Sequence, residues 1–156
     1  MTDQLRSFSQ FTYAELETKN LAAKQNRAQH ISQAEFEKEY RSYLKKDAGI
    51  KAVTLCFTNI EGRFHMLDYD KQHFLKDADN LTFDGSSVRG FTQLAESDLR
   101  LVPDWSSLRW LPADVFGPGK VLMFASIADR ESKQYLTDFR GMLKDLTDDL
   151  YSKKKN

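Results

Sequence analysis

The sequence is poor in several residues and patterns, and each shortage restricts what the protein can be. Its single cysteine, Cys56, excludes an internal disulfide and a zinc site built from cysteines. No apolar run approaches the roughly 18 residues of a membrane-spanning helix, and the first residues lack the apolar stretch of a signal peptide. Basic and acidic residues balance at 23 each, so no overall field attracts nucleic acid or an anionic membrane. We therefore expect a cytoplasmic protein that binds neither.

Glycine and proline are also scarce, and their uneven distribution divides the chain. The seven glycines all lie between Gly49 and Gly141, and the three prolines come later than residue 102. The first 48 residues contain neither helix breaker, which favours helices. Two capping boxes, Thr12–Glu15 and Ser32–Glu35, mark helix starts, because hydroxyl and carboxylate can satisfy free backbone N–H groups reciprocally. We predict an N-terminal helical extension over residues 1–48, with Gly49 suited to end its second helix.

The remainder of the chain has the patterns of a small sheet. The chain is 40% hydrophobic and 12% aromatic, which is enough for a core, and its length of 156 residues favours about one domain. From Ile50 the apolar period changes to two, which predicts strands. We expect a strand at 53–57 with one face buried more firmly, a hairpin loop at 59–62, a strand at 63–69, a short helix at 70–77, strands at 99–102 and 121–128 (the latter central), and a helix at 138–151. The predicted fold class is α+β, a mixed sheet with a helix across it.

The segment Phe83–Ser87 (Phe-Asp-Gly-Ser-Ser) holds the densest group of polar residues that could carry chemistry. Asp84 and Gly85 form a turn dipeptide, and Ser86 and Ser87 place two hydroxyls beside the carboxylate. From the residues alone, the simplest interpretation is an Asx-type turn between two strands, since Asp and Ser commonly bond their own backbone. A serine nucleophile is disfavoured, because the Gly-x-Ser-x-Gly elbow would need glycine where the chain has Arg89.

Other chemically distinctive residues favour structural roles. His30, His65 and His73 are far apart and belong to different expected elements, so we predict no metal site. We expect Cys56 to be a buried, small apolar residue. The chain's two tryptophans, Trp105 and Trp110, are expected to anchor a long loop by packing, with contact to another subunit as the alternative.

Several blocks together resemble a known family. Phe83–Ser87 is followed by Glu96–Leu99 (Glu-Ser-Asp-Leu) and by Pro103-Asp104, and both the order and the spacing are similar to the N-terminal region of bacterial-type (type I) glutamine synthetases. The resemblance covers about residues 49–151 and includes Asp138–Arg140, which is similar to the Asp-Pro-Arg that opens the family's first catalytic-domain helix. It implies a β-grasp (ubiquitin-like) domain over residues 49–136 and, over 137–156, the first helix of a truncated catalytic domain.

The resemblance also implies a role in glutamate–ammonia ligation, the ATP-dependent formation of an amide. In the family this domain lends its Phe-Asp-Gly-Ser-Ser loop to the neighbouring subunit of a ring. Asp84 and Ser87 fall on ammonium-site positions and are the catalytic candidates, and Gly85, Ser86 and Asp98 are their neighbours. A carboxylate with nearby oxygen acceptors can replace the water around ammonium. Proton loss alongside Asp84 would leave ammonia to attack γ-glutamyl phosphate.

The cofactors and partners are likewise expectations from the family. ATP and Mg²⁺ or Mn²⁺ are implied for the complete enzyme. This segment alone is expected to bind no metal or cofactor and to be inactive, because in the family the carboxylates and basic residues that handle metal and phosphate come from the catalytic domain, and no Gly-x-x-x-x-Gly-Lys-[Ser/Thr] loop is present to substitute. The expected partners are glutamine synthetase subunits in a homo-oligomeric ring, with ammonium and glutamate as small molecules. Two alternatives stay open: part of a γ-glutamyl-polyamine synthetase, or a non-enzymatic β-grasp module that binds or regulates synthetase subunits.

Overall fold

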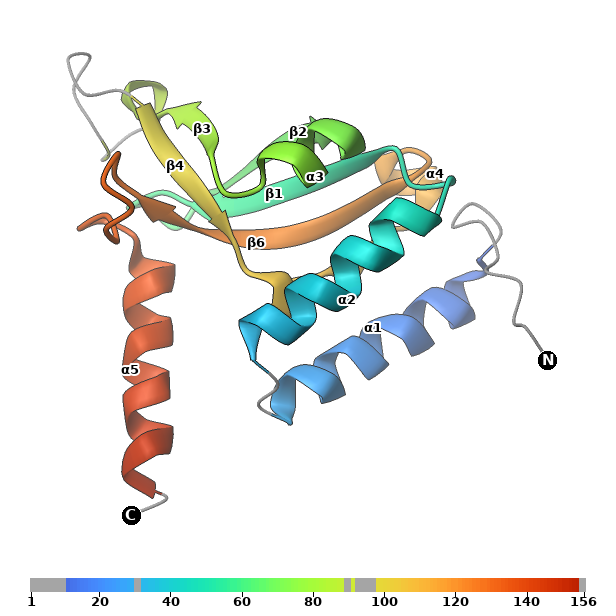
Figure 1. Ribbon diagram of the computed structural model, residues 1–156, viewed down its shortest axis with the longest axis horizontal. Coiled ribbons are helices and arrows are strands. Elements are labelled where there is room, and N and C mark those ends of the chain that lie inside the picture. Colours follow the sequence, from blue (N-terminus) through green and yellow to red (C-terminus); the bar gives the residue numbers. More distant parts are fainter. Residues whose placement is uncertain (1–10, 30–31, 89–90, 92–97, 155–156) are drawn as a thin grey trace. The chain divides into compact units, whose positions relative to one another are not determined.

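A computed structural model describes residues 11–29, 32–88, 91 and 98–154 of the chain (Figure 1). The helices are α1 (Tyr13–Ala28), α2 (Gln33–Lys46), α3 (Lys71–Asp77), α4 (Ala113–Phe116) and α5 (Phe139–Lys154). The strands are β1 (Ala52–Thr58), β2 (Phe64–Asp70), β3 (Leu81–Asp84), β4 (Asp98–Pro103), β5 (Arg109–Trp110) and β6 (Lys120–Ala128), and two 3₁₀ turns are η2 (Gly85–Ser87) and η4 (Trp105–Ser107). No helix among the described residues is long and apolar enough to cross a membrane.

The strands form one mixed sheet in the order β2-β1-β6-β4-β3, with β5 paired to β6. The predicted α+β class is therefore confirmed, and β6 is central as its near-continuous apolar run predicted. β1 differs from expectation, because every residue from Val53 to Phe57 is buried. Thr54 and Cys56 are small enough to be covered on their own face. β3 is the strand expected before the Asp84 turn, for which the sequence pattern set no bounds.

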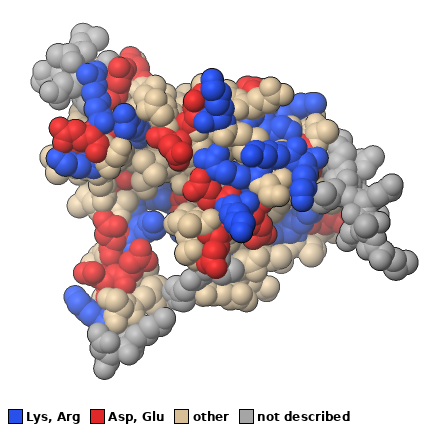
Figure 2. Space-filling view, in the orientation of Figure 1, with Lys and Arg blue, Asp and Glu red and all other residues tan. Residues whose placement is uncertain are grey.

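The chain gathers into two compact units. The first comprises residues 1–55, 67–78 and 103–124, and the second comprises residues 56–66, 79–102 and 125–156. Strands β1, β2, β4 and β6 each contribute residues to both units. Basic and acidic side chains are interspersed over the face drawn in Figure 2, as their equal numbers suggest. The three-part division predicted from the sequence stays a prediction.

Helices α1 and α2 open the first unit and lie side by side (Figure 1), as the predicted helical extension requires. Both capping boxes are formed, with Thr12 bonded to Glu15 and Ser32 bonded to Glu35. Helix α2 ends at Lys46, where Asp47 turns to an extended conformation. The Asp47 carboxylate accepts the Gly49 N–H at 2.8 Å, so a side chain, and not a left-handed glycine, organises this turn.

Aromatic rings and one buried carboxylate hold these helices to the rest of the first unit. The Trp110 ring lies edge-on to Tyr40 and Tyr43, and its indole N–H donates to the Tyr43 hydroxyl at 2.9 Å. Trp105 packs on Phe74 with ring centroids 5.4 Å apart. Both tryptophans are buried, which confirms that they act as packing anchors.

The buried carboxylate belongs to Asp104, which is 5% exposed. It accepts the backbone N–H and hydroxyl of Ser106 at 3.1 and 2.5 Å. It also accepts the Gln33 amide of α2 at 2.9 Å and lies 3.5 Å from the Arg27 guanidinium of α1. A single side chain thus links both helices to η4.

The second unit contains the predicted hairpin loop after β1. The Asn59 side-chain oxygen accepts the N–H groups of Glu61 and Arg63 at 2.9 and 3.0 Å. Gly62 has a φ of 76°, a left-handed conformation that glycine adopts without steric cost. The expected loop at 59–62 is confirmed.

Helix α5 is also present where the sequence predicted a helix, but its apolar side faces solvent. Its start is fixed by Asp138, whose Oδ2 accepts the Ile127 N–H of β6 at 3.0 Å. Gly141 lies so close that an added Cβ would be 2.4 Å from the same oxygen. The side chains at helical spacing are at least half exposed: Phe139, Met142, Leu143, Leu146 and Leu150.

The role of Asp104 gives a first test of the fold. Asp104→Ala should lower the free energy of unfolding by about 2 to 3 kcal/mol, because it leaves the buried donors of Ser106 and the half-buried amide of Gln33 without their acceptor. Asp104→Asn keeps one carbonyl oxygen and should cost less. Urea denaturation followed by circular dichroism measures both, with Asp148→Ala on the exposed side of α5 as the control. Equal midpoints for Asp104→Ala and the control would contradict the assigned role.

Candidate functional site

The candidate site lies at the end of β3, where the Phe83–Ser87 segment leaves the sheet. β3 pairs antiparallel with β4, so that Phe83 is opposite Leu99 and Asp84 is opposite Asp98. Phe83 and Leu99 are buried, and side chains alternate between the two faces of a strand. Asp84 and Asp98 therefore share the other face, and both are exposed. The register brings together two acidic residues that are 14 positions apart.

Asp84 organises the turn that follows it. Its Oδ1 accepts the backbone N–H of Ser86 at 3.0 Å and the Ser86 hydroxyl at 2.6 Å. Its Oδ2 accepts the Ser87 hydroxyl at 2.6 Å. The Asx-type turn expected from the residues alone is confirmed, and it continues as η2 with Gly85 buried. Because each hydroxyl gives its proton to Asp84, the serine oxygens keep their lone pairs for another donor.

These hydrogen bonds also set the charge of the site. The pKa of the Asp84 carboxyl is held below its ordinary value, first by the Ser86 hydroxyl and then by the Ser87 hydroxyl, because both bonds favour the ionised form. Asp84 is exposed to solvent, so no burial opposes ionisation strongly. The site thus carries a fixed, oriented carboxylate at neutral pH.

Asp98 places a second carboxylate beside the first. Directly opposed like charges in an antiparallel pair destabilise each other, and Arg130 lies 3.5 Å from Asp98. Arg100, two residues after Asp98 on β4, donates to the Ser132 hydroxyl at 2.8 Å. Sequence reasoning missed Arg130, because nothing in its spacing from Asp98 marks it as a partner. Arg130 thus offsets the charge of Asp98 on this face of the sheet.

The other residues singled out from the sequence have local roles. His65 stacks on Phe57 at 5.4 Å between centroids, and His73 lies 3.2 Å from Asp77 on α3. Cys56 is 2% exposed, and burial raises the pKa of its thiol, so it is the buried apolar residue predicted. Within the described residues no group of three or more His, Cys, Asp or Glu side chains suits a metal ion. His30, Glu96 and Ser97 fall outside the described residues.

Comparison with known proteins identifies the family. The profile of the family "Glutamine synthetase, beta-Grasp domain" matches residues 49–130, which is more than half of the chain. The chain therefore belongs to the glutamine synthetase β-grasp domain family, and the resemblance read from the Phe83–Ser87 and Asp98 blocks is confirmed. The match also confirms the predicted β-grasp fold.

Individual relatives agree with this assignment. The chain is 29% identical over 100 residues to the glutamine synthetase of Thermotoga maritima, a match covering 64% of this chain and 23% of that protein. It is 32% identical over 100 residues to the glutamine synthetase of Halobacterium salinarum, covering 63% of this chain and 22% of that protein. The chain thus spans less than a quarter of the length of these relatives.

A solved structure supports the fold. The glutamine synthetase of Plasmodium falciparum superposes with a TM-score of 0.67 at 20% identity, covering 75% of this chain and 23% of that chain. At this identity the likeness concerns the fold alone.

The hydrogen bonds at Asp84 give a test of the site's electrostatics. Replacing both hydroxyls, Ser86→Ala with Ser87→Ala, should raise the Asp84 carboxyl pKa toward its ordinary value, because the ionised form loses two donors. Carbon-13 NMR titration of the side-chain carboxyl measures the change. Ser152→Ala, at the exposed end of α5, is the control. An unchanged Asp84 titration in the double variant would show that the hydroxyls do not set its charge.

Proposed function

We propose that this chain supplies the ammonium-side loop of an ATP-dependent glutamate–ammonia ligase, with Asp84 and Ser87 as its catalytic groups. The observation that carries the proposal is an exposed, ionised Asp84 whose two oxygens are oriented by Ser86 and Ser87, in a chain of the glutamine synthetase β-grasp family. Gly85, Ser86 and Asp98 support the geometry of this loop and the negative charge beside it.

The chemistry of ammonium capture fits these groups. Ammonium has four N–H donors and is strongly hydrated, so a site must replace its water with acceptors. The Asp84 carboxylate supplies charge, and the lone pairs of the Ser87 hydroxyl supply a neutral acceptor. Asp98 adds a second carboxylate on the same face, and Arg130 lies 3.5 Å from it. Transfer of a proton from ammonium to the Asp84 carboxylate yields neutral ammonia, the nucleophile for an activated γ-carboxyl group.

Exposure of the loop supports action in a neighbouring subunit. Asp84 and Ser87 are exposed, while Leu81, Phe83, Gly85 and Val88 around them are buried. The loop is thus anchored by its apolar residues and presents its polar ones outward. We propose that it completes an ammonium site in an adjacent subunit of a ring-shaped homo-oligomer, in which glutamate is the second substrate.

In our proposal the phosphate chemistry belongs to other parts of the complete enzyme. ATP and Mg²⁺ or Mn²⁺ belong to our proposal for the complete enzyme, but the described residues do not fit them, since no carboxylate and histidine group of metal-ligating size is present among them. We therefore place no phosphoryl-transfer step on this chain. A share in amine binding is the part that its residues can perform.

Asp84 is the decisive position in the complete enzyme. In the assembled enzyme that contains this chain, Asp84→Asn should lower kcat/KM for ammonium by about tenfold or more, because a neutral amide neither neutralises ammonium nor assists its deprotonation. The dissociation constant for ATP should change less than about twofold, since the carboxylate faces the amine only. Steady-state kinetics with varied ammonium, together with calorimetric ATP titration, measures the two effects.

The matched control is Asp79→Asn, an acidic residue of the same unit outside the loop, which should leave both constants unchanged. Comparable losses for ammonium and ATP in Asp84→Asn would remove the assigned role. Running the same assay with putrescine distinguishes a glutamate–polyamine ligase, and an enzyme that uses putrescine but not ammonium would replace the first function by the second.

The isolated 156-residue chain gives an independent test. Incubated with glutamate, ATP and Mg²⁺, it should form no measurable γ-glutamyl phosphate, because the phosphate-handling groups lie outside it in our proposal. Trapping with hydroxylamine and detection of the hydroxamate measures the product, and an authentic glutamine synthetase is the positive control. Formation of hydroxamate by the chain alone would overturn this division of roles.

A further inference from the structure

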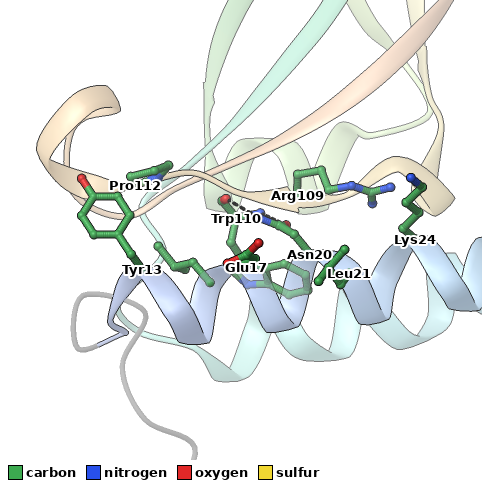
Figure 3. Close-up of a pocket in the computed structure, with 9 residues that line it drawn as sticks. Tyr13, Glu17, Asn20, Leu21, Lys24, Arg109, Trp110 and Pro112 are labelled. Carbon is green, nitrogen blue, oxygen red and sulfur yellow. Dashed lines mark hydrogen bonds between the residues drawn. The ribbon is translucent and has the colours of Figure 1, made fainter.

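A pocket of about 420 Å³ lies in the first unit, between α1 and the segment from β5 to α4 (Figure 3). Leu16 and Leu21 of α1 form one wall, and Trp110 and Pro112 form the other. Lys24 and Arg109 lie at one end, where Figure 3 shows the two side chains pointing toward each other. The pocket therefore has apolar walls and a cationic end.

The uncharged polar groups of the walls are already engaged. The Asn20 side chain donates to the Trp110 carbonyl at 3.1 Å and accepts the Trp110 N–H at 3.0 Å. The Trp110 indole N–H donates to Tyr43, and the Tyr13 hydroxyl donates to Asp114. These bonds hold the walls in place before any ligand arrives. Arg109 donates from Nη1 to the Leu108 carbonyl at 2.6 Å, so the rest of its guanidinium and the Lys24 ammonium are what the pocket offers to a ligand's charged group.

The cationic end has an excess of positive charge. Arg109 is half-buried, and its pKa is lowered by desolvation and by the nearby charge of Arg27, against the opposing influence of Tyr40 and Asp104. Asp104 lies 3.5 Å from the Arg27 guanidinium and acts on Arg109 only as a nearby negative charge. Lys24 adds a third cation one turn before Arg27 on α1. A bound anion would relieve this repulsion.

One acidic residue, Glu17, lines the pocket, and it lies away from the positive charges of Lys24 and Arg109 along α1. Glu17 precedes Lys24 by seven residues on α1, a rise of about 10 Å along the helix axis. The backbone positions of Glu17 and Lys24 are therefore about two helical turns apart.

We propose that this pocket binds a small amphipathic anion, with an aromatic or branched apolar group between Leu21 and Trp110 and a carboxylate or phosphate at Lys24 and Arg109. The volume lies within the range of ordinary small-molecule pockets, roughly 300–1,000 Å³. The apolar walls bind the body of the ligand by burial, and the two cations orient its charged group. This inference goes beyond the proposed amine chemistry and does not depend on it, because the pocket belongs to the first unit and the Asp84 loop to the second.

The two tryptophans provide the test, because they are built-in reporters. Nitrogen-15 NMR of the full chain resolves one indole N–H for Trp110, which lines the pocket, and one for Trp105, which packs on Phe74. Titration with phenylphosphate or phenylacetate should shift the Trp110 signal saturably and leave Trp105 unmoved. Benzyl alcohol, the uncharged probe, should bind about tenfold more weakly, because it lacks the charge-assisted bonds. The tighter of the two anions identifies phosphate or carboxylate as the preferred group.

Variants at Lys24 distinguish specific binding at this site from nonspecific binding of the probes. Lys24→Gln should weaken both anions about tenfold and leave benzyl alcohol unaffected, while Lys24→Arg should retain anion binding. Lys38→Gln, at an exposed position of α2 outside the pocket, is the matched control and should change nothing.

Three results would overturn the proposal. The first is a Trp110 signal that moves with neither anion at millimolar concentration. The second is equal binding of the anions and benzyl alcohol that Lys24→Gln leaves intact. The third is a Trp110 shift that follows protein concentration without any probe. The last would indicate that a second copy of the chain fills the pocket.

Discussion

The antiparallel register of β3 on β4 is the constraint on which the candidate site depends. Leu81 and Phe83 are buried opposite Leu101 and Leu99, and this apolar packing fixes the pairing. A slip of β3 by one residue would turn Asp84 inward, where its carboxylate would lose its hydration. Core packing therefore decides where the charge lies. The outward orientation of this loop depends on four hydrophobic residues.

The chain uses one short motif twice, with opposite outcomes. Asp84-Gly85-Ser86-Ser87 and Asp104-Trp105-Ser106-Ser107 both form a 3₁₀ turn in which the aspartate accepts the N–H and hydroxyl of the residue two positions on. Asp104 is buried, and α1 and α2 donate to it, whereas Asp84 is exposed. The residue after the aspartate contributes to this difference: Trp105 carries its turn into the core on Phe74, and Gly85 adds no side chain. Burial, and not the motif, separates a structural carboxylate from a candidate catalytic one.

Features governed by neighbours in sequence were predictable. The capping boxes at Thr12 and Ser32, the left-handed Gly62 and the central apolar run of β6 each follow from local rules. What the sequence did not reveal depends on tertiary pairing. β3 is only four residues long and continues directly into its turn. The opposition of Asp84 and Asp98 follows from the pairing register of β3 and β4, which the sequence does not give. No spacing rule reveals the contact between Arg130 and Asp98. The sequence also did not predict the pocket at Trp110, because its walls come from segments about 90 residues apart.

Helix α5 is held to its unit at one end. Asp138 and Gly141 fix its first turn against β6, while the apolar residues farther along are exposed. A helix of 16 residues is about 24 Å long, so a rotation of about 10° at the anchored turn would move the far end by about 4 Å. A small change of angle at the Asp138 anchor is therefore amplified along the length of α5.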